Sequence, residues 1–194
     1  AAVLLRLAGK DFSAAQRAAA KLSARRRIPL SAKQAIAMRY FAFGDEPETV
    51  KTLLTAGGAK GLSTFMSYYI LSAIKRTSGT ENALEIMKEY YGGMLEKGAT
   101  TFWEDFDVNW MAESGRIDEL PEKGQKDIHG DYGKFCYTGF RHSLCHGWSC
   151  GPIEFLAESV LGISVSGVDC KKITVSPDLG HLKYAKGKFP TPYG

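Results

Sequence analysis

Apolar residues recur at intervals of three and four along much of the chain, which is the spacing of amphipathic helices. Short turns rich in glycine, proline or serine interrupt this pattern, so we expect consecutive helices to lie antiparallel as helical hairpins. The pattern predicts the end of one helix and six further helices, over residues 1–7, 13–27, 31–44, 47–57, 63–77, 80–92 and 151–161.

Residues at the predicted helix ends support several of these boundaries. Ser13, Ser31 and Thr80 carry hydroxyl side chains, which are favoured at helix N-caps. Pro47 follows two acidic residues, as expected at a helix start, and Gly44 occupies the place of a left-handed C-terminal residue. The sequence therefore predicts a mainly helical fold built from hairpins.

The helical pattern stops over residues 105–139, where acidic residues, glycine and proline alternate with large apolar side chains. Loops of this length inside a compact domain are commonly functional or disordered. The aromatic residues favour an ordered flap folded over one end of the helices. After the last helix, residues 171–175 and 181–187 alternate as two strands, with a turn at 177–178. A lone hairpin is marginal in water, so we expect it to pack on the helices or to begin a β-domain.

Composition places the chain among ordinary soluble globular proteins, with 194 residues of which 44% are hydrophobic and 24% charged. The net charge of +4 is spread along the sequence. The tight basic run at 25–27 fits a helix C-terminus better than a nucleic-acid surface, because no aromatic stacking platform accompanies it. No apolar run reaches membrane-spanning length, so we expect neither a nucleic-acid nor a membrane partner.

The cofactor motifs that the sequence suggests are weak. The glycine-rich stretch 57–61 lacks the Gly-Lys-Ser/Thr ending of a phosphate loop and follows no strand. His142, Cys145, His146 and Cys150 are crowded enough to suggest zinc, but their spacing matches no usual zinc motif. We therefore predict no metal and no cofactor.

Residues 98–107 form the least ordinary stretch, because acids stand between large aromatic side chains. A carboxylate held against aromatic rings has its charge state set by burial and neighbours, as in general acids and bases. The hydroxyls of Thr100 and Thr101 can orient such a carboxylate. On composition alone, a solvated turn whose aromatic residues fill the core is the competing interpretation.

The segment from Thr100 to Glu104, Thr-Thr-Phe-Trp-Glu, is followed by His-Ser-Leu-Cys-His-Gly-Trp from His142 to Trp148. Together they resemble the catalytic end of the α-L-rhamnosidase family, glycoside hydrolase family 78. By this resemblance Glu104 is the general base and His146 contacts the sugar. Cys145 and Gly147 replace the asparagine and the aromatic residue that the family commonly has.

The resemblance extends from about residue 33 to the end, and it implies a fold. The helices would form part of an (α/α)6 toroid, with residues 1–168 in the catalytic domain. Residues 169–194 would begin a C-terminal β-sandwich, since the Pro-Asp-Leu-Gly-His-Leu segment at 177–182 matches its first motif. Because the sequence opens inside a helical pattern, we also expect a longer parent protein whose remaining chain completes the fold.

The resemblance also implies an inverting hydrolysis of terminal α-L-rhamnosides. Inversion needs two carboxyl groups about 6.5–9.5 Å apart, one protonating the leaving oxygen and one activating water. Glu104 would activate the water. The family's general acid comes from an earlier segment that has no match here, so we expect it outside these residues.

Further side chains would contact a carbohydrate partner, and the family favours a periplasmic or extracellular location. Trp103 and Trp148 offer faces for sugar C–H groups, with core packing as their alternative role. His142 and Thr101 lie beside the expected pocket. Two other functions stay open: a six-hairpin glycosidase acting on another sugar, and a carbohydrate-binding helical domain without turnover.

Overall fold

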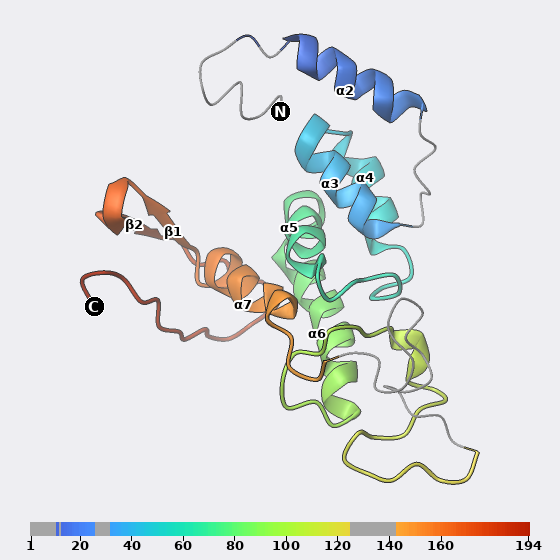
Figure 1. Cartoon of the computed structure of the whole chain (residues 1–194). Coiled ribbons are helices and arrows are strands. Elements are labelled where there is room, and N and C mark those ends of the chain that lie inside the picture. Colours follow the sequence, from blue (N-terminus) through green and yellow to red (C-terminus); the bar gives the residue numbers. More distant parts are fainter. Residues whose placement is uncertain (1–10, 12, 26–31, 125–142) are drawn as a thin grey trace.

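Helix α5 lies at the centre of the fold (Figure 1). The computed structural model describes residues 11, 13–25, 32–124 and 143–194. In it α5 (Ser67–Ser78) contacts four helices: α3 (Lys33–Phe43), α4 (Pro47–Thr55), α6 (Thr80–Glu96) and α7 (Gly151–Phe155). Helix α2 (Ser13–Arg25) precedes them. The described part of the chain is thus mainly helical, as the sequence predicted.

Burial of one continuous apolar cluster explains the central place of α5. Ile70, Leu71, Ala73 and Ile74 of this helix are fully buried, and the other helices pack their apolar residues around them. Removing such side chains from water is the main favourable contribution to folding. The predicted helix over 1–7, the Ser31 cap and the loop residues 125–139 lie outside the described residues.

The helix ends follow some of the predicted signals and not others. Gly44 adopts the left-handed conformation (φ 70°, ψ 49°), and its N–H donates to the Tyr40 carbonyl. Pro47 is the first residue of α4, and the Glu46 carboxylate caps that helix by accepting two backbone N–H groups. The prediction for Thr80 was wrong: Gly79 is the N-cap, and Thr80 donates its hydroxyl to Asp178.

Two helix boundaries differ from the sequence pattern. Helix α5 begins at Ser67 rather than residue 63, because residues 64–66 form turns. Helix α6 continues through Gly93 to Glu96. A Cβ atom at Gly93 would lie 2.6 Å from the Met111 sulfur and 3.1 Å from the Phe106 ring. The glycine therefore serves close packing of the following loop on the helix, and it does not end the helix.

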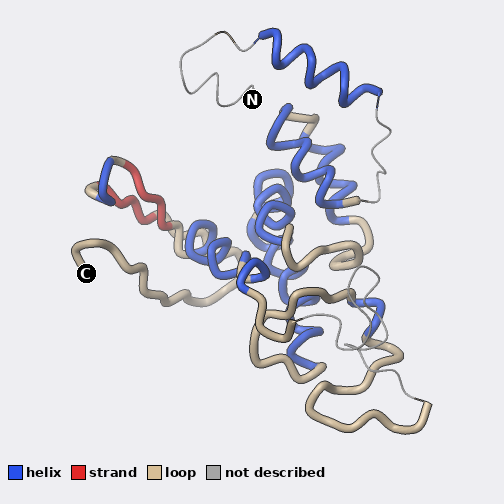
Figure 2. The backbone as a smooth tube through the Cα atoms, in the orientation of Figure 1, coloured by secondary structure: helices blue, strands red, loops and turns tan. Residues whose placement is uncertain are grey.

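The C-terminal region contains a two-stranded antiparallel sheet (Figure 2). Helix α7 continues into a π-helical turn, η3 (Leu156–Val160), and strand β1 (Ile163–Ser166) then pairs with β2 (Lys172–Val175). The predicted strand at 171–175 is confirmed. The predicted strand at 181–187 was wrong, because the short Ile-Ser-Val-Ser alternation at 163–166 supplies the partner of β2 instead.

Residues 177–182 bind to the beginning of α6. The Asp178 carboxylate accepts the Thr80 hydroxyl, and this hydrogen bond lowers the pKa of Asp178. The Asp178 N–H donates to the Val160 carbonyl over 3.1 Å. Leu179 and Leu182 pack against the core. This segment therefore ties η3 to α6.

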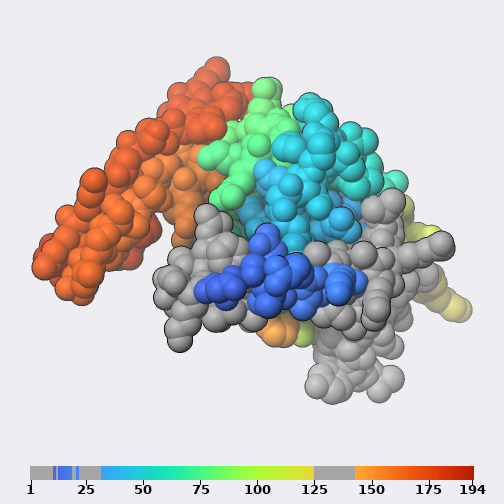
Figure 3. All heavy atoms as spheres, turned by 90° about the horizontal axis from the view of Figure 1, so that it is seen from above, coloured from blue at the N-terminus to red at the C-terminus, as the bar shows by residue number. Residues whose placement is uncertain are grey.

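Strands β1 and β2 project from the helical body, and the C-terminal part of the chain forms an arm at one side (Figure 3). Every residue of β2 is exposed, including Ile173 and Val175. The apolar side chains of β2 are therefore not buried against the described helices. In the described ranges, no helix has the length and apolar character needed to cross a membrane.

Candidate functional site

The two sequence segments that resemble the glycosidase motifs lie side by side. The Glu104 N–H donates to the Ser143 carbonyl over 2.9 Å, and the His146 N–H donates to the Phe102 carbonyl over 2.8 Å. These two backbone hydrogen bonds join residues about forty positions apart in the sequence. They bring the predicted general base and the predicted sugar-contacting histidine into one site.

Aromatic side chains anchor the first segment in the core. Trp103 and Phe106 are almost fully buried, with ring centroids 5.9 Å apart. The buried Tyr90 hydroxyl donates to the Phe106 carbonyl over 2.5 Å. Burial raises the pKa of Tyr90 well above its usual value, so the hydroxyl keeps the proton that it donates. Glu104 is thus held between two residues of a rigid backbone segment.

The Glu104 carboxylate is oriented by the second segment. Its Oε2 atom accepts the Ser143 N–H over 2.8 Å and lies 3.8 Å from Nδ1 of His146. Each of the two side chains is 26% exposed. The backbone carbonyl of Glu104 accepts the Thr64 hydroxyl. The carboxylate therefore has one fixed donor while remaining accessible to a ligand.

An aromatic surface lies next to this carboxylate. The Trp148 ring is 4.4 Å from the His146 ring and 5.1 Å from the Phe65 ring, measured between centroids. Trp148 is 55% exposed and Phe65 51% exposed. Exposed aromatic faces of this kind can take the C–H faces of a sugar while a polar edge stays in water.

The other predicted site residues have different places. Thr101 donates its hydroxyl to the Leu144 carbonyl, so it joins the two segments and does not orient the Glu104 carboxylate. Trp103 is buried completely and belongs to the core in this structure, which is the alternative role that the sequence left open. His142 lies outside the described residues.

Sequence reasoning missed two contributors to the site. The Ser143 amide orients Glu104, and Phe65 extends the aromatic surface. Ser143 is a member of the second motif, but a backbone donor has no signature in the sequence. Phe65 lies in the stretch where the sequence predicts a helix over 63–77, and that pattern gives no sign that its ring is exposed.

The described residues give no support for a metal site. Among them, no three His, Cys, Asp or Glu side chains are close enough together to hold an ion. Cys145 and Cys150 have free thiols, and Cys145 is exposed. Comparison of the sequence with protein-family models and with curated proteins finds no significant match.

Proposed function

We propose that this chain belongs to an inverting α-L-rhamnosidase-like glycoside hydrolase in which Glu104 is the general base. The observation that carries the proposal is the pairing of the two segments, which places Nδ1 of His146 3.8 Å from Oε2 of Glu104. Nothing in the sequence spacing of these residues requires that proximity. It is the arrangement that a base and a sugar-contacting residue of one active site need.

The surroundings of Glu104 suit activation of a water molecule. A general base must be ionised, accessible and fixed within hydrogen-bond reach of the proton that it takes. The Ser143 N–H donates to Oε2 over 2.8 Å and so fixes the orientation of the carboxylate. Because this bond occupies one direction at Oε2, Oε1 is the oxygen that we assign to the attacking water.

His146 and Trp148 supply the proposed contacts with the sugar. The half-exposed indole can stack on the sugar ring, and the imidazole can donate to a hydroxyl group beside the scissile bond. Terminal rhamnose, a deoxy sugar with a methyl group, would place apolar surface against Trp148 and Phe65. Another sugar remains the second candidate, since Cys145 and Gly147 depart from the family motif.

The general acid and the larger architecture are also part of the proposal. The Asp105 carboxylate accepts the Phe106 N–H and the Asp107 carboxylate accepts the Asn109 N–H, each over 2.9 Å, so both have local structural roles. We assign the acid to the remainder of the parent chain. We assign the helical hairpins to an (α/α)6 toroid and the exposed β1–β2 hairpin to the start of a β-sandwich that would cover Ile173 and Val175.

The test is hydrolysis of an aryl α-L-rhamnoside by the whole protein that contains these residues, with Glu104→Gln beside the wild type. The amide keeps the size of the side chain but cannot accept the proton. We expect the variant to lose about 10²–10⁴-fold in kcat while its circular dichroism and unfolding midpoint stay unchanged. Glu96→Gln is the matched control, because Glu96 is exposed at the end of α6.

Each other outcome would change the assignment. A wild type that cleaves only a different glycoside would retain Glu104 as the base and replace the sugar. A wild type that binds rhamnose-containing oligosaccharides but cleaves no glycoside would favour the carbohydrate-binding domain, which the exposed Trp148 surface also suits. Full activity in Glu104→Gln would refute the proposed base.

A further inference from the structure

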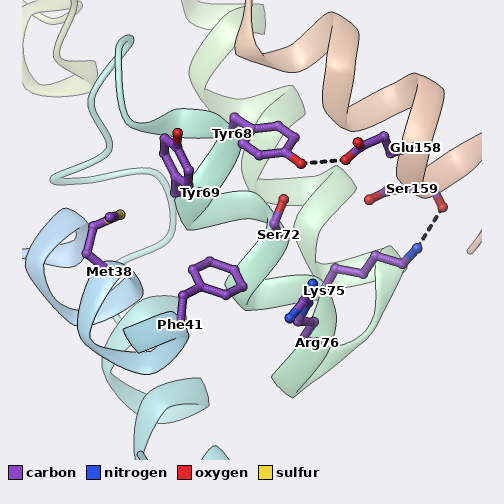
Figure 4. Close-up of a pocket in the computed structure, with 9 residues that line it drawn as sticks. All are labelled: Met38, Phe41, Tyr68, Tyr69, Ser72, Lys75, Arg76, Glu158 and Ser159. Atoms are coloured by element: carbon purple, nitrogen blue, oxygen red, sulfur yellow. Dashed lines mark hydrogen bonds between the residues drawn. The ribbon is translucent and has the colours of Figure 1, made fainter. Parts of the chain in front are cut away.

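A cavity lies apart from the Glu104 carboxylate, between α3, α5 and η3 (Figure 4). It has a volume of about 450 Å³, within the usual range for small-molecule sites. It contains both aromatic and charged side chains. Its lining residues are Met38, Phe41, Tyr68, Tyr69, Ser72, Lys75, Arg76, Glu158 and Ser159.

Arg76 is the cationic group in this cavity that is available to a ligand. Its guanidinium carbon lies 4.9 Å from the centre of the Phe41 ring, which holds the group by a cation–π contact. No carboxylate among the described residues pairs with it within 4.0 Å. Lys75, by contrast, donates to the Ser159 carbonyl over 2.8 Å. The planar donors of Arg76 are therefore free to bind a carboxylate in two-point fashion.

The acid in the cavity is already paired with a donor. The Tyr68 hydroxyl donates to the Glu158 carboxylate, as the dashed line in Figure 4 marks. Burial and this carboxylate raise the pKa of Tyr68 to about 12, so the phenol stays neutral. Glu154 also interacts with Tyr68, and Asp178 interacts with Lys75, so the other charges around the cavity have opposite charges nearby. Arg76 is therefore the group of the lining that suits an anionic ligand.

The remaining lining suits a sugar ring. Tyr69 presents a partly exposed ring, and Figure 4 shows the Ser72 hydroxyl between Tyr68, Tyr69 and Arg76. An aromatic face with hydroxyl and guanidinium donors around it matches a pyranose that carries a carboxylate. A purely apolar ligand would leave these polar groups without partners.

The cavity and the aromatic surface beside Glu104 both adjoin the start of α5, since Phe65 contacts Trp148 and Tyr68 lines the cavity. Gly151, three residues after Trp148, packs so closely on Tyr68 that an added Cβ would lie 3.0 Å from the Tyr68 Cβ. From Tyr68 to Arg76 the helix then rises about 12 Å. A glycan chain with one unit on Trp148 could therefore continue along α5 into the cavity.

We propose that this cavity is a second subsite, which binds a uronate unit of the glycan whose terminal sugar lies at Glu104. Arg76 binds the carboxylate of the uronate, Tyr69 stacks on its ring and Ser72 contacts a hydroxyl. The assignment rests on the proposed glycosidase function for the identity of the neighbouring unit. It extends that function from a single terminal sugar to an acidic polysaccharide or oligosaccharide.

The test is calorimetric titration of the whole protein with glucuronate and galacturonate, and with glucose and galactose as matched neutral sugars. We expect the uronates to bind at least about tenfold more tightly than the neutral sugars. Arg76→Gln should remove that difference, because the amide keeps a donor but loses the charge. Arg39→Gln is the control, since Arg39 is paired with Asp45 at 2.6 Å and does not line the cavity.

A second variant tests the location independently of charge. Ser72→Leu fills the cavity and should abolish uronate binding without altering the net charge. Equal affinity for uronates and neutral sugars, or unchanged uronate binding in both cavity variants, would overturn the proposal. If benzoate bound more tightly than either uronate, the claim that the ligand is a sugar would be overturned.

The binding experiment requires no turnover, which separates the two proposals. Uronate binding should persist in Glu104→Gln. If that variant keeps full hydrolytic activity while Arg76→Gln loses uronate binding, the proposed base fails and the subsite stands. If hydrolysis depends on Glu104 but uronates do not bind, the subsite fails and the proposed function stands.

Discussion

Nδ1 of His146 lies 3.8 Å from Oε2 of Glu104, an oxygen that already accepts the Ser143 N–H over 2.8 Å. The histidine is therefore close enough for a charge interaction but beyond direct hydrogen-bond distance. Its position is fixed by its own backbone, which donates to the Phe102 carbonyl. The imidazole ring is thus placed to meet a ligand that approaches the carboxylate.

This relationship predicts how the proposed glycosidase activity responds to His146→Gln. The amide can donate one hydrogen bond but cannot carry positive charge or reproduce the ring contact with Trp148. We expect kcat/KM for the rhamnoside to fall about 10–100-fold, mainly through a higher KM, because a substrate hydrogen bond is weakened. Steady-state kinetics on the whole protein measure the two parameters separately.

His181→Gln is the matched control for that experiment. His181 lies on the C-terminal segment, with Nε2 3.2 Å from Glu85, and it takes no part in the site. Its substitution should leave KM unchanged. If His146→Gln also leaves KM unchanged, His146 has no role in sugar binding, and the Glu104 assignment loses its main structural support.

The buried Tyr90 hydroxyl predicts a stability difference. Tyr90→Phe leaves the Phe106 carbonyl without its donor, and we expect a loss of about 1–3 kcal/mol in the free energy of unfolding. Urea unfolding at neutral pH, followed by circular dichroism, measures this loss. Tyr184→Phe is the control, since its ring is exposed. An equal effect of the two substitutions would contradict the assigned role.

The same residue predicts a dependence on alkaline pH. Burial raises the pKa of Tyr90, and that of Tyr91, above 10, the value of a tyrosine in the unfolded chain. Above pH 10 the unfolded state therefore binds fewer protons than the folded state, so stability falls as pH rises. The stability that the buried, protonated tyrosines contribute is fully present below pH 10. Tyr90→Phe should show a smaller loss of stability than the wild type between pH 9 and 11.

The helices could be predicted from the sequence because local signals and burial agree along most of the chain. Pro47 and Gly44 stand at helix ends where the backbone geometry itself selects them. Thr80 failed as a cap because a distant acceptor, Asp178, takes its hydroxyl. Gly93 failed as a helix end because the loop packs against it. In both cases a tertiary contact overrode a local preference.

In the candidate site, too, local sequence signals predicted some features, and tertiary contacts determined the others. Glu104 and His146 could be selected from the sequence because each belongs to a recognisable motif. The proximity of the two side chains depends on backbone pairing between distant segments, which no local pattern specifies. The positions of Tyr69 and Arg76 beside one cavity depend likewise on how α3 and η3 pack on α5.

The junction between η3 and the sheet provides a further prediction about stability. Gly162 has a left-handed conformation (φ 69°), and its carbonyl accepts the Ser176 N–H over 2.9 Å. A Cβ atom at this position would lie 1.8 Å from the Ser176 carbonyl oxygen. Gly162→Ala must therefore displace backbone as well as accept a strained φ angle, and the β1–β2 hairpin would shift away from the helices.

Gly44→Ala isolates the conformational part of this effect. Gly44 has nearly the same φ angle (70°), but no atom lies within 4 Å of an added Cβ. We expect Gly44→Ala to cost about 1–2 kcal/mol, the usual penalty of the left-handed region for a side chain. Gly162→Ala should cost about 1–3 kcal/mol more, because overpacking is added. Urea unfolding of both variants gives the difference. Equal losses would show that the contact between Gly162 and Ser176 relaxes without cost, and that the hairpin is not held at this junction.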